Sequence, residues 1–396
     1  MSMLASTTAP STTKTVLPAS SRVESVDFFR GLAIIGMIIV NNPGGSGDQA
    51  YAPLKHAEWN GWTPTDLIFP FFLFSMGISM VYSFASRLKR GESPRRLLLH
   101  VLRRGALLFA IGLFLNGYPA WPNHYHFATL RLVGVMQRIA LCYVVASIIM
   151  MWCGTRGRIV TVAACLVGYW LLMRFVPVPG YGVPTRDVPL LDPAGNISAW
   201  LDRMLYSNHM HGHPFDSEGL LSTIPALGTT LIGVLTGEWL RSSVAGMRKA
   251  VWMTVFGFIG LVSGSIFGIW FPINKKLWTS SYVLFHCGFA LILLALCYWV
   301  LDVKRWRGRW TIPVEVFGVN AITAYILSEV AGTGLERLVL HFSDGSSMTF
   351  QDFAYERWLM PLASPANASL IYSLVFLTVC GMIMWPLYRK GVYIKI

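Results

Sequence analysis

The chain has 396 residues, of which 54% are hydrophobic and only 13% are charged, and its mean hydropathy is +0.52. A soluble protein of this length needs more charge to cover its surface, so the composition excludes a soluble globular protein. The basic residues behind the formal net charge of +13 lie mainly in short segments between apolar runs, a pattern that excludes a nucleic-acid-binding face.

Apolar runs of about 17–25 residues recur along the chain, and each is long enough to cross about 30 Å of hydrocarbon. The sequence therefore predicts an all-α fold, a polytopic transmembrane helical bundle of ten or eleven spans within residues 25–396. Residues 1–24 are rich in Ser, Thr, Ala and Pro and are expected to form a disordered cytoplasmic tail. Ten spans are placed at 26–41, 65–85, 97–117, 131–152, 159–176, 221–240, 251–271, 279–301, 313–331 and 367–388.

Basic residues are distributed unevenly between the two sides of these spans. Nineteen Lys and Arg residues lie in the terminal segments and in alternate loops, whereas seven lie in the remaining loops. The positive-inside rule then places both termini in the cytoplasm and the loops 42–64, 177–220 and 332–366 outside.

Asp27 and Arg30 lie three residues apart on one helix face and are expected to pair. Charges within spans must face the bundle interior or reach back to the surface. The arginines within or at the edges of the spans are Arg30, Arg103, Arg104, Arg131, Arg138 and Arg174.

The first outer loop follows Asn41 and contains the run HAEWNGWTPTD, which starts at His56. Histidine titrates near neutral pH and can take a proton from an attacking amine or hydroxyl, so His56 is a candidate general base. The alternative is an interfacial histidine that bonds a backbone carbonyl. Asn41 can hold a carbonyl or orient a nucleophile through hydrogen bonds.

Two later outer segments also carry charged side chains. Asp216 and Glu218 precede a span, where carboxylates can bind sugar hydroxyls or an ammonium group, or can simply cap the helix. The run NKKLW places Lys275 and Trp278 outside, and an interfacial aromatic belt is the alternative explanation. The three histidines within 209–213 and the six cysteines, none in a CxxC pair, predict neither a metal site nor a disulfide framework.

Several short blocks occur together in one order: SVDFFRG (25–31), VN (40–41), HAEWNG (56–61), DLIFP (66–70), GVMQR (134–138), FDSEG (215–219) and NKKLW (274–278). This set resembles the heparan-alpha-glucosaminide N-acetyltransferase family, from about residue 22 to the C-terminus. The chain lacks a counterpart of the long lumenal N-terminal domain of the animal enzyme, so the resemblance is to the bacterial members. A multi-pass protein of the bacterial inner (cytoplasmic) membrane is therefore expected.

The resemblance implies a transmembrane acyltransferase that moves an acetyl group from cytosolic acetyl-CoA to an amino sugar of the glucosamine type on the periplasmic side. His56 matches the family's proposed catalytic histidine, and Asn41 matches the asparagine that works with it. The residues expected to bind the acceptor are Trp59, Asn60, Asp66, Asp216 and Glu218. The residues expected to bind acetyl-CoA are Arg103, Arg104, Gln137, Arg138, Lys275 and Trp278.

Two other functions fit the same residues. One is a sugar permease, in which the intramembrane charges line a substrate path, and the other is an O-acetyltransferase of envelope polysaccharide. The acetyl group could pass directly to the acceptor or through an acetylated His56. The expected partners are acetyl-CoA, an amino sugar or glycan acceptor and membrane lipid, without nucleic acid or metal, and a homodimer is left open.

Overall fold

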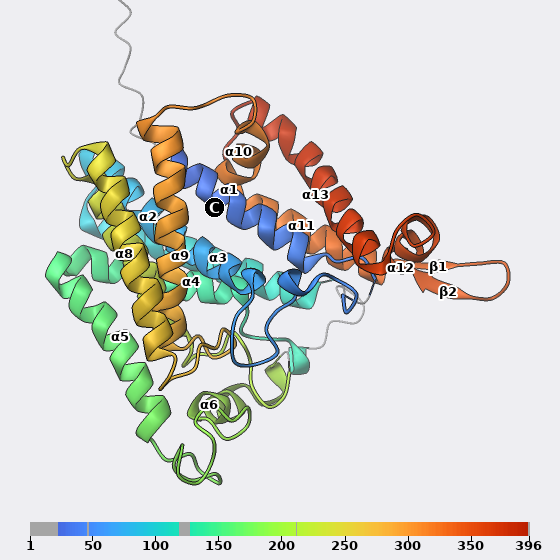
Figure 1. Cartoon of the computed structure of the whole chain (residues 1–396), viewed down its shortest axis with the longest axis horizontal. Helices are drawn as coiled ribbons and strands as arrows, with labels where there is room; N and C mark the ends of the chain where they lie inside the picture. Colours follow the sequence, from blue (N-terminus) through green and yellow to red (C-terminus); the bar gives the residue numbers. More distant parts are fainter. Residues whose placement is uncertain (1–22, 46, 119–126, 211, 395–396) are drawn as a thin grey trace, which may run out of the picture.

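The computed structural model describes residues 23–45, 47–118, 127–210 and 212–394. Almost all of the expected disordered tail, 1–24, lies outside this part of the chain. The described residues are mainly helical, and Figure 1 shows the helices packed together as a bundle. The elements are α1 (Glu24–Asn41), α2 (Ile68–Lys89), α3 (Pro94–Gly117), α4 (Val135–Trp152), α5 (Thr155–Phe175), α6 (Ile197–Tyr206), α7 (Thr223–Arg241), α8 (Gly246–Phe267), α9 (Ser280–Tyr298), α10 (Ile312–Val319), α11 (Ala321–Arg337), β1 (Val339–His341), β2 (Ser347–Thr349), α12 (Phe350–Phe353) and α13 (Pro365–Arg389).

Helix fills most of each range that was expected to span the membrane, so the prediction of a polytopic helical membrane protein is confirmed. Among the described residues, seven helices are long and apolar enough to cross a membrane, and an eighth is added if α10 and α11 count as one span. Ten spans are more than length and composition support. Of the ten expected spans, the two that do not meet this criterion are α1 and α7, which are more polar than a typical span. Helix α1 carries Glu24, Asp27 and Arg30, and α7 carries several threonines.

The predicted ion pair between Asp27 and Arg30 forms inside the bundle. Nη2 of Arg30 lies 2.5 Å from Oδ1 of Asp27. Its Nε donates to the carbonyl of Gly318 on α10 at 2.7 Å, and its Nη1 donates to Oγ of Ser79 on α2 at 3.1 Å. The arginine is therefore satisfied by protein groups, as a charge in a membrane span must be, and it ties α1 to two neighbouring helices.

The ninth expected span is a broken helix, because α10 and α11 meet at an angle of 89°. The break lies at Asn320, whose backbone leaves the helical region with φ −123° and ψ 45°. Its side chain binds the segment that follows α13. Nδ2 donates to the carbonyl of Val392 at 2.9 Å, and Oδ1 accepts from the backbone N–H of Ile394 at 3.0 Å. The bend thus brings the chain beyond α13 against the junction of α10 and α11.

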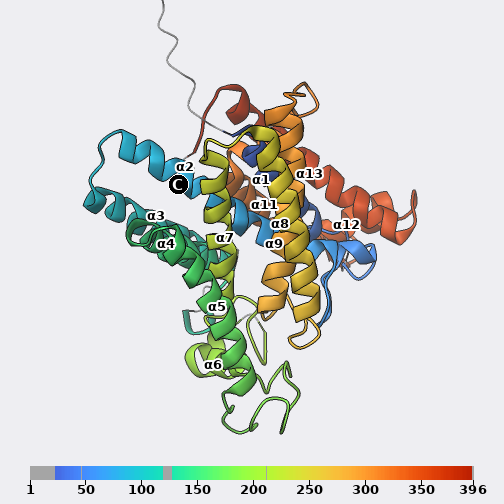
Figure 2. The same cartoon turned by 60° about the vertical axis from the view of Figure 1, so that its left-hand side comes forward.

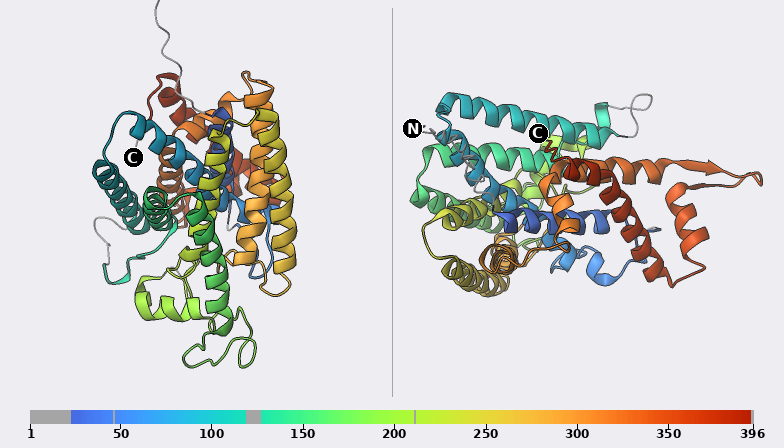
Figure 3. Two further views of the ribbon diagram at one scale, coloured as in Figure 1. Left: turned by 90° about the vertical axis from the view of Figure 1, so that its left-hand side faces the viewer. Right: turned by 90° about the horizontal axis from the view of Figure 1, so that it is seen from above.

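Helices α1, α2, α4 and α9 supply much of the buried apolar core. In Figure 2 and the left view of Figure 3, α8 lies along α9, and α3 and α4 form a second pair beside the core. Close contact between α2 and α7 depends on Gly77 and Gly233. A Cβ at either position would lie 2.1 Å from a carbonyl oxygen of the other helix, so only glycine allows this approach.

The long segments expected as outer loops contain short elements that the sequence did not predict. Segment 177–220 includes α6, and segment 332–366 includes α12 and a hairpin of β1 and β2. The antiparallel register pairs Val339 with Thr349 and His341 with Ser347. The hairpin projects from one end of the bundle in Figure 1 and in the right view of Figure 3.

The predicted topology can be tested by labelling cysteines introduced at two exposed positions, Ser347 in the hairpin and Lys89 at the end of α2. The excess of basic residues on the side of Lys89 predicts that an impermeant maleimide labels Ser347→Cys in intact cells and Lys89→Cys only after the membrane is opened. A parent carrying Cys153→Ser lowers the background, because Cys153 is partly exposed and the other five cysteines are buried. The reverse labelling pattern would contradict the orientation.

Candidate active site

A polar cavity of about 440 Å³ brings together residues that are far apart in the sequence. Its wall includes Asn41 at the end of α1, His56 in the first outer loop, Gln137 on α4, and Glu218 and Lys275 from later outer segments. All five are predicted site residues. The fold therefore collects one predicted general base, its predicted partner and three predicted ligand-binding residues around one space.

His56 is oriented by a buried carboxylate. Its Nδ1 lies 2.6 Å from Oδ1 of Asp66, whose side chain is 1% exposed. Because an ionised carboxylate only accepts, Nδ1 carries the hydrogen, and the lone pair on Nε2 is left available for a proton. The other oxygen of Asp66, Oδ2, accepts from the backbone N–H groups of Ala57 at 3.1 Å and Thr63 at 3.0 Å.

Asp66, which was expected to bind the acceptor, instead contacts His56 and the backbone of its own loop. Its carboxylate lies behind the imidazole in the 3₁₀ turn Pro64–Leu67, and the Tyr282 hydroxyl donates to its backbone carbonyl. The side chain is occupied by protein donors on both oxygens. This geometry favours a role in orienting His56, and direct acceptor binding by Asp66 stays a prediction.

Lys275 lies beside this pair. Its Nζ is 3.3 Å from both ring nitrogens of His56 and 4.0 Å from Oδ1 of Asp66. Burial lowers the pKa of Lys275, and the nearby Glu218 and Asp66 carboxylates only partly offset that effect. Lys275 was expected to contact coenzyme A. Its position next to the imidazole fits a contact with the reacting end of a bound thioester, not with the nucleotide phosphates.

Asn41 is paired with an acid that sequence reasoning missed. Its Nδ2 donates to Oε1 of Glu329 on α11 at 3.1 Å, and Glu329 also lines the polar cavity. The two residues are 288 positions apart and share no motif. A usable signal was nevertheless present, because an ionisable residue within an apolar run is a functional candidate by default. The second hydrogen on Nδ2 of Asn41 can still be donated to a ligand.

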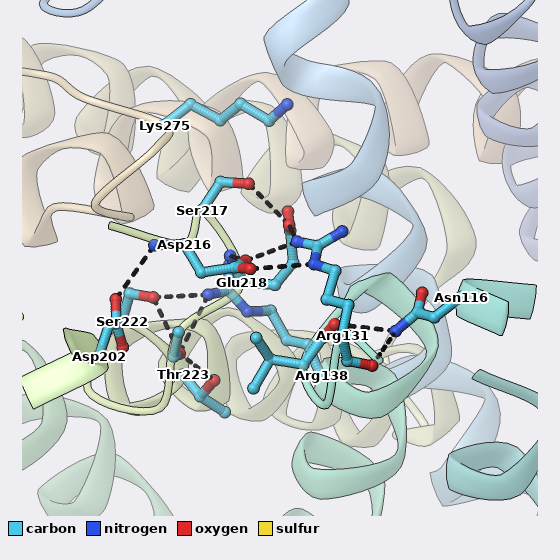
Figure 4. A network of polar contacts seen from close by, with 12 residues as sticks. Asn116, Arg131, Arg138, Asp202, Asp216, Ser217, Glu218, Ser222, Thr223 and Lys275 are labelled. Atoms are coloured by element: carbon cyan, nitrogen blue, oxygen red, sulfur yellow. Dashed lines mark hydrogen bonds and ion pairs between the residues drawn. The ribbon is translucent and has the colours of Figure 1, made fainter. Parts of the chain in front are cut away.

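The predicted acids Asp216 and Glu218 are both bound by Arg131, as Figure 4 shows. Nε and Nη2 of Arg131 lie 2.9 and 2.5 Å from the two oxygens of Asp216, and Nη2 lies 2.6 Å from Oε2 of Glu218. Burial is the largest influence and raises the pKa of Glu218, but Arg131, Arg138 and the Ser217 hydroxyl together outweigh it, so the pKa is lowered. Both carboxylates are therefore engaged by protein groups, and their binding to an acceptor stays a prediction.

Asp202 supports this turn from below. Its Oδ2 accepts from the backbone N–H of Asp216 at 3.3 Å, and burial raises the pKa of Asp202 to about 7. A Cβ at Gly219 would lie 2.3 Å from Oδ1 of Asp202, so a larger residue there would have to displace this carboxylate. Asp202 lies in α6, which places this helix directly against the turn 215–219.

Three residues expected to bind acetyl-CoA lie around α4. Gln137 is 2% exposed, lines the polar cavity, and neither atom of its amide has a hydrogen-bond partner among the described residues. Arg138 is buried: its Nη2 donates to Oγ of Ser222 at 2.5 Å, and its guanidinium lies 4.9 Å from the centre of the buried Trp278 ring. Gln137 faces the cavity, whereas Arg138 and Trp278 support its wall, and their contact with the cofactor stays a prediction.

A second, basic cavity of about 530 Å³ lies between α1, α2, α3 and the junction of α10 and α11. Its wall contains Arg30, Arg87, His100 and Arg104, and the guanidinium of Arg104 lies 4.8 Å from the centre of the Tyr143 ring. Arg103 is exposed on α3, beside a surface groove that Arg104 also lines. The expected pair of cofactor arginines therefore has one member inside the cavity and one outside it.

An apolar throat of about 10 Å³ connects the two cavities. It shares Met37 and Tyr325 with the polar cavity and Phe72 and Ile139 with the basic one. The polar cavity, the throat and the basic cavity thus lie in series. The apolar throat therefore lies between the cavity of Arg104 and the cavity of His56.

Comparison with known proteins gives the family. The family model described as heparan-alpha-glucosaminide N-acetyltransferase, catalytic, matches residues 22–272, more than half of the chain and all of the segment from Asn41 to Glu218. The chain belongs to this family. The resemblance inferred from the sequence blocks is therefore confirmed.

Two curated members of the family are similar over almost the whole chain. The mouse heparan-alpha-glucosaminide N-acetyltransferase is 29% identical over 431 aligned residues, which cover 96% of this chain and 61% of the mouse protein. The human protein is also 29% identical, over 428 residues that cover 95% of this chain and 60% of the relative. The chain thus spans about three fifths of the length of these relatives.

The two remaining predicted acceptor residues of this family member connect two outer segments. Nε1 of Trp59 donates to the carbonyl of Leu191 at 2.8 Å, and its ring centre lies 5.0 Å from that of Phe215. Oδ1 of Asn60 accepts from Nδ2 of Asn274 at 3.3 Å. Trp59 thus holds the loop that carries His56 against segment 177–220, and Asn60 holds it against the loop that carries Lys275. Acceptor binding by Trp59 and Asn60 stays a prediction.

The histidines of segment 209–213 do not assemble with other ligands in the part of the chain that is described. His209 donates from Nδ1 to the carbonyl of Leu130 at 2.8 Å, and His211 lies outside the described residues. Within the described ranges no group of three or more His, Cys, Asp or Glu side chains gathers in a way that could hold a metal ion.

Proposed function

We propose that the protein is a transmembrane acetyltransferase that moves an acetyl group from cytosolic acetyl-CoA to the amine of a glucosamine-type sugar at the periplasmic face of the bacterial inner membrane. Family membership supports the acetyltransferase chemistry. The observation that carries the proposal is His56, oriented by the buried Asp66, in one cavity with Asn41. An oriented imidazole next to an amide donor is suited to acyl transfer.

The proposed reaction is direct transfer. The amine nitrogen of the sugar attacks the thioester carbonyl, the new C–N bond forms, and the C–S bond breaks. Nε2 of His56 takes the proton lost by the amine, and the coenzyme A thiolate leaves and is protonated. The free hydrogen on Nδ2 of Asn41 donates to the oxyanion that develops on the carbonyl oxygen. Asp66 stabilises the imidazolium that results.

The series of cavities supports entry of acetyl-CoA from the cytoplasm. The nucleotide phosphates need positive charge, and Arg104 is the arginine of the basic cavity that we assign to this role. Arg30 and Arg87 line the same cavity, but each is already in an ion pair, with Asp27 and Glu92 respectively. The pantetheine arm is thin and can extend through the apolar throat once side chains such as Met37 give way. In the polar cavity, the unpartnered amide of Gln137 suits an amide group of that arm, since a buried amide without a partner is costly. The excess of basic residues on the side of Arg87 supports the cytoplasmic assignment.

Replacing Arg104 with alanine is expected to raise the Kd of coenzyme A by about 10- to 100-fold, because loss of a charged hydrogen bond costs about 1.5–3 kcal/mol. Dephospho- or truncated coenzyme A is expected to lose less. Calorimetric titration of purified protein measures both affinities. Arg103→Ala is the matched control, because it removes the neighbouring charge from the exposed face of the same helix. Equal affinities for the wild type and Arg104→Ala would leave Arg104 as a helix anchor.

Purified protein reconstituted in liposomes tests the proposed function. With labelled acetyl-CoA and glucosamine we expect labelled N-acetylglucosamine, and with acetyl-CoA confined to one side we expect product only from the orientation that exposes the basic cavity to it. Uptake of unmodified sugar without acetyl-CoA would identify a permease instead. Label that is released by hydroxylamine would identify an ester and hence an O-acetyltransferase.

A further inference from the structure

A further cavity of about 410 Å³ adjoins the polar cavity at His56. Of the residues that line the two spaces, only Val40 and His56 are common to both. His56 therefore lies at the boundary between two spaces. We propose that this cavity, here called the vestibule, binds the amino-sugar acceptor, while the polar cavity receives the thioester. This inference rests on the proposed acetyltransferase function.

The vestibule is built from two segments. One wall is the loop that runs from Pro43 to Glu58, and the other is the first part of α13, which contributes Ser369 and Ser373. Its volume falls within the range of about 300–1,000 Å³ that small-molecule sites occupy. A monosaccharide or the end of a glycan therefore fits this space, whereas a long polymer must enter it by one end.

The chemistry of the vestibule suits a cationic sugar. Asp48 and Glu58 line it, and within the described residues neither carboxylate forms an ion pair. The one lysine in the lining, Lys55, donates its Nζ to the backbone carbonyl of Asp48. Carboxylates without cationic partners attract the ammonium group of an amino sugar and also accept from its hydroxyls.

Tyr51 adds an aromatic surface to the same space. Its side chain is 40% exposed, and its hydroxyl donates to Oδ1 of Asn367 on α13 at 2.6 Å, which fixes the ring. An exposed aromatic face packs against the apolar C–H face of a sugar and attracts a nearby cation. By contrast, the predicted acceptor acids Asp216 and Glu218 are bound to Arg131. The carboxylates of the vestibule are therefore more available to bind an amino sugar than Asp216 and Glu218, which were expected from the sequence.

Separate sites for the two substrates have a mechanistic consequence. The amine reaches Nε2 of His56 from the vestibule and the thioester carbonyl reaches it from the polar cavity, so the two substrates do not compete for space. The bound ammonium first gives one proton to water, because only the neutral amine is a nucleophile. The amine then loses a second proton to Nε2 as its nitrogen bonds to the carbonyl carbon, the C–S bond breaks, and the thiolate departs into the polar cavity and is protonated. Changes in the vestibule should then alter the KM for the sugar and leave the affinity for coenzyme A unchanged.

The test compares Asp48→Asn, Glu58→Gln and the double variant in the full-length protein, by steady-state kinetics with glucosamine and acetyl-CoA. Each single change is expected to raise the KM for glucosamine by about 3- to 10-fold, since partly exposed charge contacts are weaker than buried ones. The Kd of coenzyme A should stay within about twofold. Tyr51→Ala should raise the KM as well, whereas Tyr51→Phe, which keeps the ring, should not. Asp344→Asn, in the exposed turn between β1 and β2, is the matched control.

A second measurement does not depend on transfer. Saturation-transfer NMR with glucosamine alone should give a signal with the wild type and lose it with the double variant. Equal signals, or an unchanged KM in all the vestibule variants, would overturn the vestibule while leaving the proposed function intact if the wild type transfers acetyl. A wild type that binds glucosamine in the vestibule but transfers no acetyl would overturn the proposed function and keep the site.

Discussion

Replacing His56 with alanine is expected to reduce acetyl transfer by about 10²–10⁴-fold, the usual loss when a general base is removed. The effect should fall on kcat, because the imidazole accepts the proton only as the amine attacks. Coenzyme A should still bind with nearly wild-type affinity, since the cationic residues Arg30, Arg87 and Arg104 lie in the other cavity, beyond the apolar throat.

Initial rates and calorimetric titration on the same purified samples separate these two effects. Mass spectrometry of the wild type with acetyl-CoA alone also distinguishes the chemical routes: direct transfer leaves His56 unmodified, whereas a two-step route yields an acetylated protein. Near wild-type turnover by His56→Ala would reduce this residue to an interfacial histidine. Lower coenzyme A affinity with unchanged kcat would assign His56 to binding and not to catalysis.

Changing Asp66 to asparagine should be almost as harmful, by about 10²–10⁴-fold in kcat, although the side chain keeps its shape. Oδ2 of Asp66 accepts from the N–H groups of Ala57 and Thr63, so the oxygen of the new amide must stay on that side. Its NH₂ group then faces Nδ1 of His56 and donates to it. The ring hydrogen moves to Nε2, which can no longer take a proton from the amine.

The decisive measurement is kcat of Asp66→Asn in protein that is shown to be folded like the wild type. Circular dichroism and the affinity for coenzyme A should match the wild type, because the amide fills the same space and the cofactor arginines are remote. Asp344→Asn provides a control for removal of one carboxylate from an exposed loop. Retention of wild-type kcat by Asp66→Asn would show that the bond of 2.6 Å to His56 has no catalytic role.

The sequence predicted the bundle because apolar runs mark helices regardless of their neighbours. It also singled out Asn41, at the end of such a run, and His56, in the loop between two of them, and the fold places both on one cavity. The sequence suggested that Asp66 binds the acceptor, and only the fold shows that both of its carboxylate oxygens are bound by protein groups. The same local signals could not show that α10 and α11 meet at 89°, a bend held by bonds to residues beyond α13.

Pairings over long sequence separations could not be predicted. Arg131 was noted only as a charge at the edge of a span, yet it binds Asp216 and Glu218, which lie more than eighty positions away. Glu329 reaches Asn41 across 288 positions. Such contacts depend on which helix faces meet, and hydropathy does not encode that choice. The vestibule has the same origin, because its two walls come from the first outer loop and from α13.

The narrow apolar throat also bears on the electrical integrity of the membrane. A space of about 10 Å³ is at the lower limit for a single water molecule, and its lining of Ile34, Phe72 and Ile139 offers that water no polar partners. A continuous file of water, and with it a path for protons, therefore cannot form between the two larger cavities while the throat is empty. Hydrophobic constrictions of this kind block ions by excluding water. If acetyl groups cross through this protein as proposed, the throat would let them do so without dissipating the membrane potential.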